Sequence, residues 1–197
     1  MDDLDDETLA LKTRLQSRWR SPDGEAILAR VGSALRGRHP WASHVASLPD
    51  VEDVMNRQDL RGAPWERATL DNADLRATEL QFADLREASL QAADFRGADL
   101  TRTDFARANM TGANFAGARL ILANLEHANL SDANLAGALL TGANLEGANF
   151  TNAILRGAVL FGARTEGAVF DGAVMDGVRF GQFAGQNTPP SGSGQAV

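Results

Sequence analysis

Ala113-Asn114-Phe115-Ala116-Gly117 and Ala143-Asn144-Leu145-Glu146-Gly147 are two copies of a five-residue unit that repeats 25 times, without a gap, between residues 58 and 182. Every fifth residue from Leu60 to Phe180 is large and apolar in 24 of 25 cases, with Thr165 as the exception. The residue two places earlier is Ala in 21 of the 25 units. The repeat is therefore Ala-(Asp/Asn)-Leu-x-x, and it decides the fold.

A period of five fits neither an α-helix nor a flat strand. Residues five apart point about 140° away from each other on a helix, and on a strand an odd step reverses the face. A three-residue strand followed by a two-residue corner does fit, because it turns the Ala and the large residue inward and the residue between them outward. Glycine recurs at the second corner position, which favours a turn with positive φ. We therefore expect one side of a coil per repeat, with coils stacked about 4.8 Å apart.

The two units quoted above, together with Ala73-Asp74-Leu75-Arg76-Ala77, resemble the signature of the pentapeptide repeat proteins. The resemblance implies an all-β solenoid, a right-handed quadrilateral β-helix with four repeats in each coil. The 125 residues of repeat would then form about six coils and a rod about 30 Å long at the strand spacing. The resemblance says much less about function, because the consensus is a packing requirement.

Residues 1–57 lack the repeat and predict a small α-helical N-terminal cap. Acidic residues up to Glu7 precede apolar residues at helical spacing up to Trp19, and the basic residues Arg14, Arg18 and Arg20 follow, which is the charge order that a helix dipole favours. A second helix after Pro22 and a third short segment near Asp50 are expected. Such a cap would cover the open backbone edge of the first coil. The predicted organisation is a helical cap over 1–57, a β-helix over 58–182 and a flexible C-terminal tail over 183–197.

The sequence offers no catalytic constellation. It contains no cysteine, which excludes thiol chemistry and Cys-ligated metal sites and is typical of a cytoplasmic protein. The histidines at His39, His44 and His127 are scattered, and none has partners at the spacing of a catalytic triad or metal site. No apolar run approaches membrane-spanning length, and the N-terminus is acidic where a secretory signal is basic. We expect a bacterial, cytoplasmic protein that is not an enzyme and binds no cofactor or metal.

The outward residue of the repeat changes from acidic to amide along the chain. Seven outward positions up to Asp104 are Asp or Glu, whereas Asn dominates from Asn109 onward. Stacked Asn side chains can form amide ladders, but stacked Asp side chains repel unless they are balanced. Four of the aspartates have an arginine two residues later on the same outward side: Asp59 and Arg61, Asp74 and Arg76, Asp84 and Arg86, and Asp94 and Arg96. These charges predict a solvated, mutually screened surface.

The acidic residues also suggest an alternative function through the family resemblance. Some pentapeptide repeat proteins, including those that protect bacteria from quinolones, resemble duplex DNA in shape and negative charge and bind DNA gyrase or topoisomerase IV. The repeat region has 16 Asp and Glu against 11 Arg, and with residues 1–57 the chain reaches a net charge of −7. Such a charge disfavours direct binding of nucleic acid. At 20 residues per coil, Glu126, Glu146 and Glu166 would align in an acidic column with no Arg between them at that column position.

The side of the coil that carries Leu120, Leu140 and Leu160 has apolar residues at outward and corner positions that are polar elsewhere. An exposed apolar patch usually marks an interface. Three occupants are open: a partner protein, a second copy of the chain in a homodimer, or the chain's own N-terminal helices. The predicted patch consists of Ile121, Leu122, Leu139, Val159 and Phe161.

These observations predict a non-catalytic scaffold for protein–protein interaction of the pentapeptide repeat type. It would act by rigid surface presentation, because a rigid rod loses little ordering entropy when it binds. The partner is a protein that the sequence does not name, and no membrane is involved. The alternative is a DNA-mimicking modulator or protector of type II topoisomerase.

Overall fold

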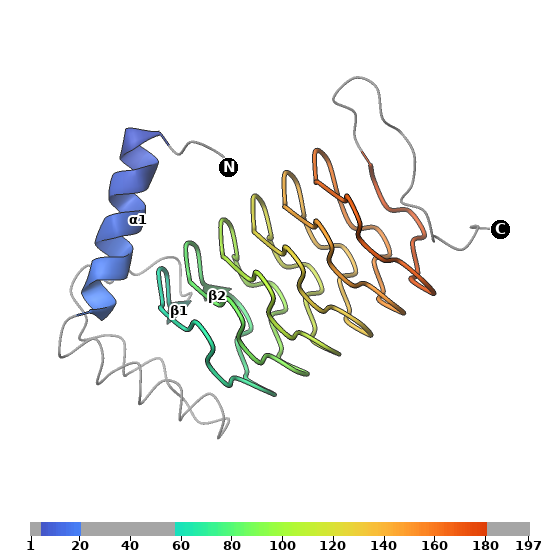
Figure 1. Cartoon of the computed structure of the whole chain (residues 1–197), viewed down its shortest axis with the longest axis horizontal. Helices are drawn as coiled ribbons and strands as arrows, with labels where there is room; N and C mark the ends of the chain where they lie inside the picture. The colour runs from blue at the N-terminus through green and yellow to red at the C-terminus, as the bar shows by residue number, and fades with distance from the viewer. Residues whose placement is uncertain (1–4, 21–57, 181–197) are drawn as a thin grey trace.

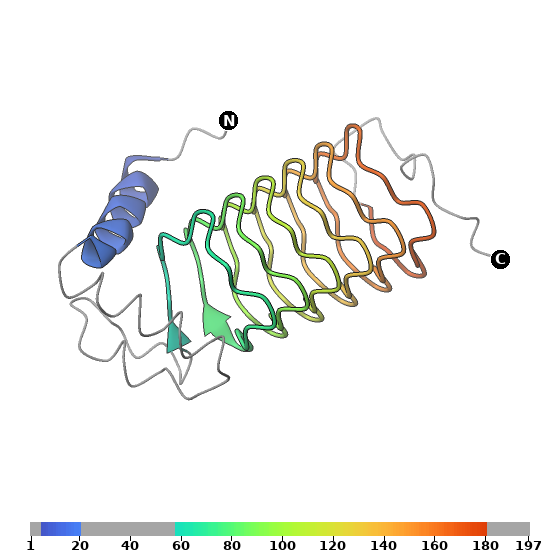
Figure 2. The ribbon, with the colours of Figure 1, turned by 60° about the horizontal axis from the view of Figure 1, so that its bottom comes forward.

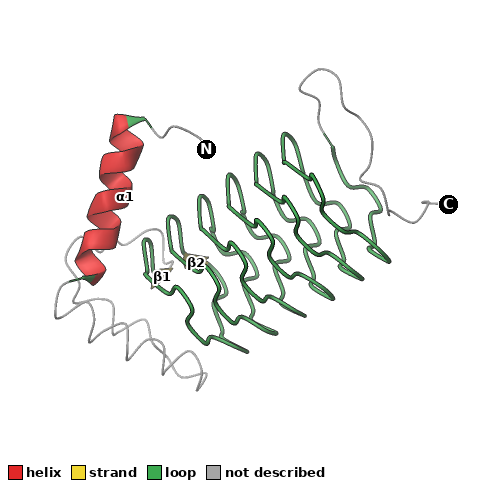
Figure 3. Cartoon of the chain, viewed as in Figure 1, coloured by secondary structure: helices red, strands yellow, loops and turns green. Residues whose placement is uncertain are grey.

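The computed structural model describes residues 5–20 and 58–180. Within them lie one helix, α1 (Asp6–Trp19), and two short parallel strands, β1 (Gln58–Asp59) and β2 (Thr78–Glu79). The remaining described chain forms stacked coils that run from the teal end beside α1 to the orange end (Figure 1). Most of each coil is drawn as loop in Figure 3 because its sides are too short to count as strands.

The coils are held together by parallel backbone pairing between residues 20 positions apart. Asp84 pairs with Asp104, which pairs with Asn124, and the same step recurs along the chain as far as Val159 and Arg179. Four five-residue repeats therefore complete each coil, and the coils stack in register (Figure 2). This confirms the four-sided coil that the family resemblance implies, with one repeat on each side.

Each coil has four sides, and we name the resulting faces after one inward residue of each. The Leu120 face carries the patch residues, and the Leu125 face carries the three glutamates of the acidic column. The Phe115 face includes the column Leu75, Phe95, Phe115 and Leu135, and the Phe150 face completes the square. Residues 20 apart share a face, so the sequence can be read directly as four surfaces.

The second corner residue has positive φ at all 24 positions from Gly62 to Gly177. Twelve of these are glycine and twelve are not, including Ala77 at 51° and His127 at 55°. A left-handed backbone costs a residue with a side chain roughly 1–2 kcal/mol. Stacking against neighbouring coils must offset this cost, because glycine occupies only half of the corners.

The inward Ala and large residues form one continuous core that is almost fully shielded from solvent. The rings of Phe95 and Phe115 stack at 4.8 Å, and Phe105 meets each of them edge to face. Thr165 is only half-buried, but so are Ala163 and Ala168 in the same last described coil. Its exposure therefore reflects its place near the end of the rod as well as its polarity.

Helix α1 packs against the first coil. Asp5 caps its N-terminus by accepting a hydrogen bond from the Thr8 backbone N–H at 2.8 Å. Leu15 and Trp19 are buried, and the Trp19 Nε1–H donates to the Arg61 carbonyl oxygen at 2.8 Å. A Cβ atom at Gly62 would lie 2.8 Å from the backbone carbonyl carbon of Leu15. The predicted second and third helices and the tail lie outside the described residues.

Candidate functional site

The five patch residues gather on the Leu120 face, and each is partly exposed. Leu139 pairs directly with Val159 on the next coil, and Arg119 and Arg179 continue this outward column on either side. The Arg179 guanidinium lies over the Phe161 ring, 5.1 Å from its centroid. The result is an apolar strip along the rod with an arginine at each end.

The described packing contacts of α1 are with the first coil, and the charge interactions of this segment extend to Asp84 and Arg102 on the second and third coils but not to the patch. Trp19 and Leu15 meet Arg61 and Gly62 beside the teal coil, whereas the patch begins three coils further along (Figure 1). Among the three predicted occupants, the described part of the N-terminal helices therefore does not cover the patch.

The three glutamates of the acidic column align on the Leu125 face as their spacing predicts. The column is nevertheless partly neutralised, because Arg164 Nη2 lies 2.6 Å from Glu146 Oε2. His127 Nε2 lies 3.8 Å from Glu126 Oε1, and its side chain is exposed. Arg164 belongs to the outward column and the glutamates belong to the adjacent corner column. The residues of the corner column alone therefore do not predict this ion pair.

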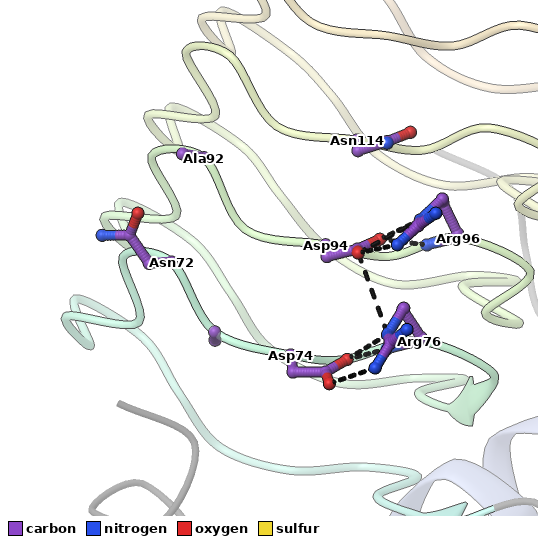
Figure 4. Close-up of a pocket in the computed structure, with 8 residues that line it drawn as sticks. Asn72, Asp74, Arg76, Ala92, Asp94, Arg96 and Asn114 are labelled. Atoms are coloured by element: carbon purple, nitrogen blue, oxygen red, sulfur yellow. Dashed lines mark hydrogen bonds and ion pairs between the residues drawn. The ribbon is translucent and has the colours of Figure 1, made fainter. Parts of the chain in front are cut away.

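The predicted Asp–Arg pairs form on the outward surface. Arg76 binds Asp74 through two bonds of 2.7 Å, and Arg96 Nη2 lies 2.6 Å from Asp94 Oδ2. The Arg76 side chain also reaches Asp94 at 3.8 Å, so the two pairs join into a ladder along an open groove of the Phe115 face (Figure 4). The hydrogen bonds from Arg76 hold the pKa of Asp74 below its ordinary value. Cations and anions in this groove are matched, which leaves no free charge to select a small ion.

The change from Asp to Asn creates amide ladders between coils. The Asn144 side-chain N–H donates to Asn124 Oδ1 at 3.2 Å, and Asn149 donates to Asn129 Oδ1 at the same distance. Asn124 in turn donates to Asp104 Oδ1 at 3.0 Å. Burial, together with the neighbouring Asp84, raises the pKa of Asp104. At Asp104, where the aspartates give way to asparagines, the fold therefore disfavours the ionised carboxylate.

Asp104→Asn is expected to stabilise the protein near neutral pH by several tenths to about 1 kcal/mol, since the 38% exposure of this side chain screens the effect. The folded-state pKa of Asp104 is raised, so the fold disfavours the ionised form. The gain should be full above the raised pKa and vanish as the pH falls below the ordinary value of 3.8, where the folded and unfolded states are both protonated. Urea unfolding of both proteins at neutral and acidic pH measures this difference. A gain that grew as the pH fell would contradict it.

Sequence reasoning missed a second set of outward apolar residues near the end of the rod. Ile154 is 39% exposed and Val169 is 41% exposed, and Ile154 pairs with Val174 on the next coil. They occupy the same position of the repeat as Leu139 and Val159, but on the Phe115 and Phe150 faces. The signal in the sequence is an apolar residue at the outward position of the repeat, and it is found only when the outward positions of all four faces are compared.

Across residues 5–20 and 58–180, no group of three or more His, Asp or Glu side chains is arranged to hold a metal ion. In the same part of the chain, no helix has the length and apolar character needed to cross a membrane. The surface features that stand out there are the patch, the paired charges and the amide ladders.

A family model for pentapeptide repeats matches eight copies, over residues 59–91, 88–126, 118–157 and 153–182. Among curated proteins, none matches this sequence significantly. The chain is similar to the solved pentapeptide repeat protein Rfr23 from the cyanobacterium Cyanothece 51142, at 28% identity, with a TM-score of 0.41 and coverage of 63% of this chain and 84% of that one. HetL from the cyanobacterium Nostoc sp. strain PCC 7120 is 34% identical, with a TM-score of 0.25 over 61% of this chain and 67% of its own. QnrB1, a plasmid-mediated fluoroquinolone resistance protein, is 23% identical, with a TM-score of 0.41 over 64% and 66%. Because the repeat model spans most of the chain, this chain belongs to the family of pentapeptide repeat proteins.

Proposed function

We propose that this protein is a non-catalytic scaffold for protein–protein interaction, and that the patch on its Leu120 face is the binding surface. The observation that carries the proposal is the direct pairing of Leu139 with Val159, at outward positions where earlier coils of the same face carry Asp59, Glu79 and Asp99. Aliphatic side chains at these positions add nothing to the inward core. With Ile121, Leu122 and Phe161 at the neighbouring corners they form a continuous apolar surface suited to an interface, whereas the charged corner residues Arg156 and Asp176 adjoin the outward pair Ile154 and Val174.

The rod supports this function by holding the patch in a fixed geometry. The Leu120 N–H donates to the Leu139 carbonyl oxygen at 2.7 Å, and the Leu140 N–H donates to that of Val159 at 2.7 Å. The backbone under the patch is therefore ordered before any partner arrives, and binding costs little additional backbone entropy. We further propose that α1 belongs to a helical cap that covers the first coil, with Leu15 and Trp19 as its anchors.

Replacing Leu139 and Phe161 together with Asp is expected to abolish capture of the partner while the rod remains folded. Both side chains are partly exposed, so the charges remain hydrated and the inward core is untouched. Affinity capture from the native organism, followed by mass spectrometry, compares this variant with the unaltered protein. Circular dichroism checks the fold, and size-exclusion chromatography with light scattering tests for a homodimer that the variant loses.

Ile154→Asp is the matched control, because Ile154 is also an exposed aliphatic residue at the outward position but lies on the Phe115 face. This variant should retain the partner. Loss of the same partner from both variants, or its retention by the Leu139 and Phe161 variant, would exclude the patch as the binding surface. Unfolding of the double variant would assign these residues to the core of the protein.

The alternative function, a DNA-mimicking modulator or protector of DNA gyrase or topoisomerase IV, requires a rod with sustained negative potential. Here the Asp–Arg ladder on the Phe115 face and the pair between Arg164 and Glu146 interrupt that potential. We therefore expect micromolar protein neither to inhibit supercoiling by purified gyrase nor to protect the enzyme from a fluoroquinolone. A gel-based supercoiling assay, run with and without drug, measures both effects. Inhibition or protection that Glu146→Gln weakens would favour the alternative.

A further inference from the structure

The Leu120 face has no free backbone edge at the patch. The Leu139 N–H donates to the Ala118 carbonyl oxygen at 3.0 Å, and the Leu139 carbonyl oxygen accepts from Leu120 at 2.7 Å. The same pattern continues on the next coil, where Val159 bonds to Ala138 and Leu140. A partner strand therefore cannot add to this surface by backbone pairing. Contact has to come from side chains, which favours a partner element whose own backbone is already satisfied.

The part of this face that holds the patch is opposite in charge to the protein as a whole. Between Arg119 and Phe180, its outward and corner residues include two arginines and no acidic residue, in a chain of net charge −7. Over the same stretch, the Leu125 face carries Glu126, Glu146 and Glu166. Arg119 lies 3.4 Å from Asp99, whereas Arg179 has no ion pair within the described part of the chain and covers Phe161. The surface is therefore apolar, with a cation without an ion pair at its Arg179 end and a paired cation at its Arg119 end, and it complements a partner that is apolar and acidic.

The distance between successive side chains along the strip matches a partner α-helix better than a partner strand. Coils repeat about every 4.8 Å along the rod, and the side chains on one stripe of an α-helix recur about every 5.4 Å. A strand lying along the rod would repeat its side chains on one face about every 6.6 Å and lose register within two coils. A helix parallel to the rod can thus set one turn against each coil across the whole strip.

The chain already packs a helix near the same face. Gly62 is the corner residue of the Leu120 face on the first coil, and Leu15 of α1 lies against it. The pKa of Asp5, at the start of α1, is lowered chiefly by hydrogen bonds from Thr8, and the positive charge of Arg102 adds to this effect. Arg102 is the equivalent corner residue two coils further along. The corner column of the Leu120 face therefore already accepts a helix at its first coil.

We infer that the patch binds an acidic amphipathic helix of a partner protein, laid along the rod with its apolar stripe on Leu139, Val159 and Phe161 and its acidic residues near Arg119 and Arg179. This inference rests on the proposed function and specifies the class of partner.

The test uses the full chain and fluorescent synthetic peptides. One peptide carries Leu in a single helical stripe and Glu at the remaining surface positions, a second has the same composition with the stripe scrambled, and a third has Lys in place of Glu. Fluorescence anisotropy should show binding of the first peptide, and binding about tenfold weaker for the other two. Arg179→Glu should weaken the first peptide about tenfold, as should higher salt. Arg156→Glu on the Phe115 face is the matched control and should have no effect.

Absence of binding, equal binding of the Lys peptide, or indifference to Arg179→Glu would overturn the inference. Binding to phosphatidylserine vesicles in preference to the Glu peptide would also overturn it, because the patch would then recognise an anionic lipid surface. These results are separable from failure of the proposed function. If the double variant at Leu139 and Phe161 loses its captured partner while the peptide does not bind, only the helix inference fails. If the captured partner is retained, the proposed function fails.

Discussion

Replacing Phe115 with Ala is expected to lower the free energy of unfolding by about 3–5 kcal/mol. Phe115 is fully buried, stacks on Phe95 at 4.8 Å and meets Phe105 edge to face at 6.2 Å. Its removal leaves a cavity between coils whose backbone is fixed by pairing on both sides. Since the coils cannot approach each other to close that cavity, the loss should lie toward the upper end of the range.

The matched control is Phe115→Leu, because Leu occupies the same inward column at Leu75 and Leu135. This variant should lose only about 1 kcal/mol, since most of the volume is retained. Urea unfolding followed by circular dichroism gives both values. If the Ala and Leu variants lost equal stability, the aromatic cluster would not be the main source of cohesion in this part of the rod.

Gly62→Ala is expected to detach α1 from the first coil. Gly62 has a φ of 70°, which costs a residue with a Cβ about 1–2 kcal/mol. The added Cβ would also lie 2.8 Å from the Leu15 carbonyl carbon and 3.0 Å from the Gln16 nitrogen. These are backbone atoms that no rotamer change can move, so relief requires the helix to shift, at an overpacking cost of about 1–3 kcal/mol.

Gly117→Ala separates the two costs, because Gly117 has a similar φ of 66° and nothing lies within 4 Å of the position of its added Cβ. This control should show only the backbone strain. Limited proteolysis within α1, together with urea unfolding, should show faster cleavage and a larger loss of stability for Gly62→Ala. Equal behaviour of the two variants would mean that the contact between Leu15 and Gly62 does not hold the helix.

The repeat predicts one side of a coil per unit, because five residues specify what faces in, what faces out and where the chain turns, and the family resemblance supplies the number of four sides. The Asp74–Arg76 and Asp94–Arg96 pairs were predictable for the same reason, since residues two apart share the outward side. The contact between Arg164 and Glu146 was not, because it runs diagonally between two columns and depends on the length of the arginine side chain.

The position of α1 could not be predicted from the repeat. Gly62 is one of twelve corner glycines with positive φ, and its sequence context does not show that a helix needs the missing side chain there. The contact depends on Leu15, which lies outside the repeats. Periodicity specifies the relations between coils, but it contains no information about a segment that does not share the period.

Because residues 20 apart pair, the number of residues between two positions determines how many coils separate them and which side of the rod each one faces. Inserting four repeats between Arg102 and Ile121 would carry the patch one coil further from α1 and leave it facing the same way. Inserting a single repeat there would turn the patch by one side of the square relative to α1. The gain or loss of a single five-residue repeat during evolution can therefore change the direction in which a surface faces, without any substitution within that surface.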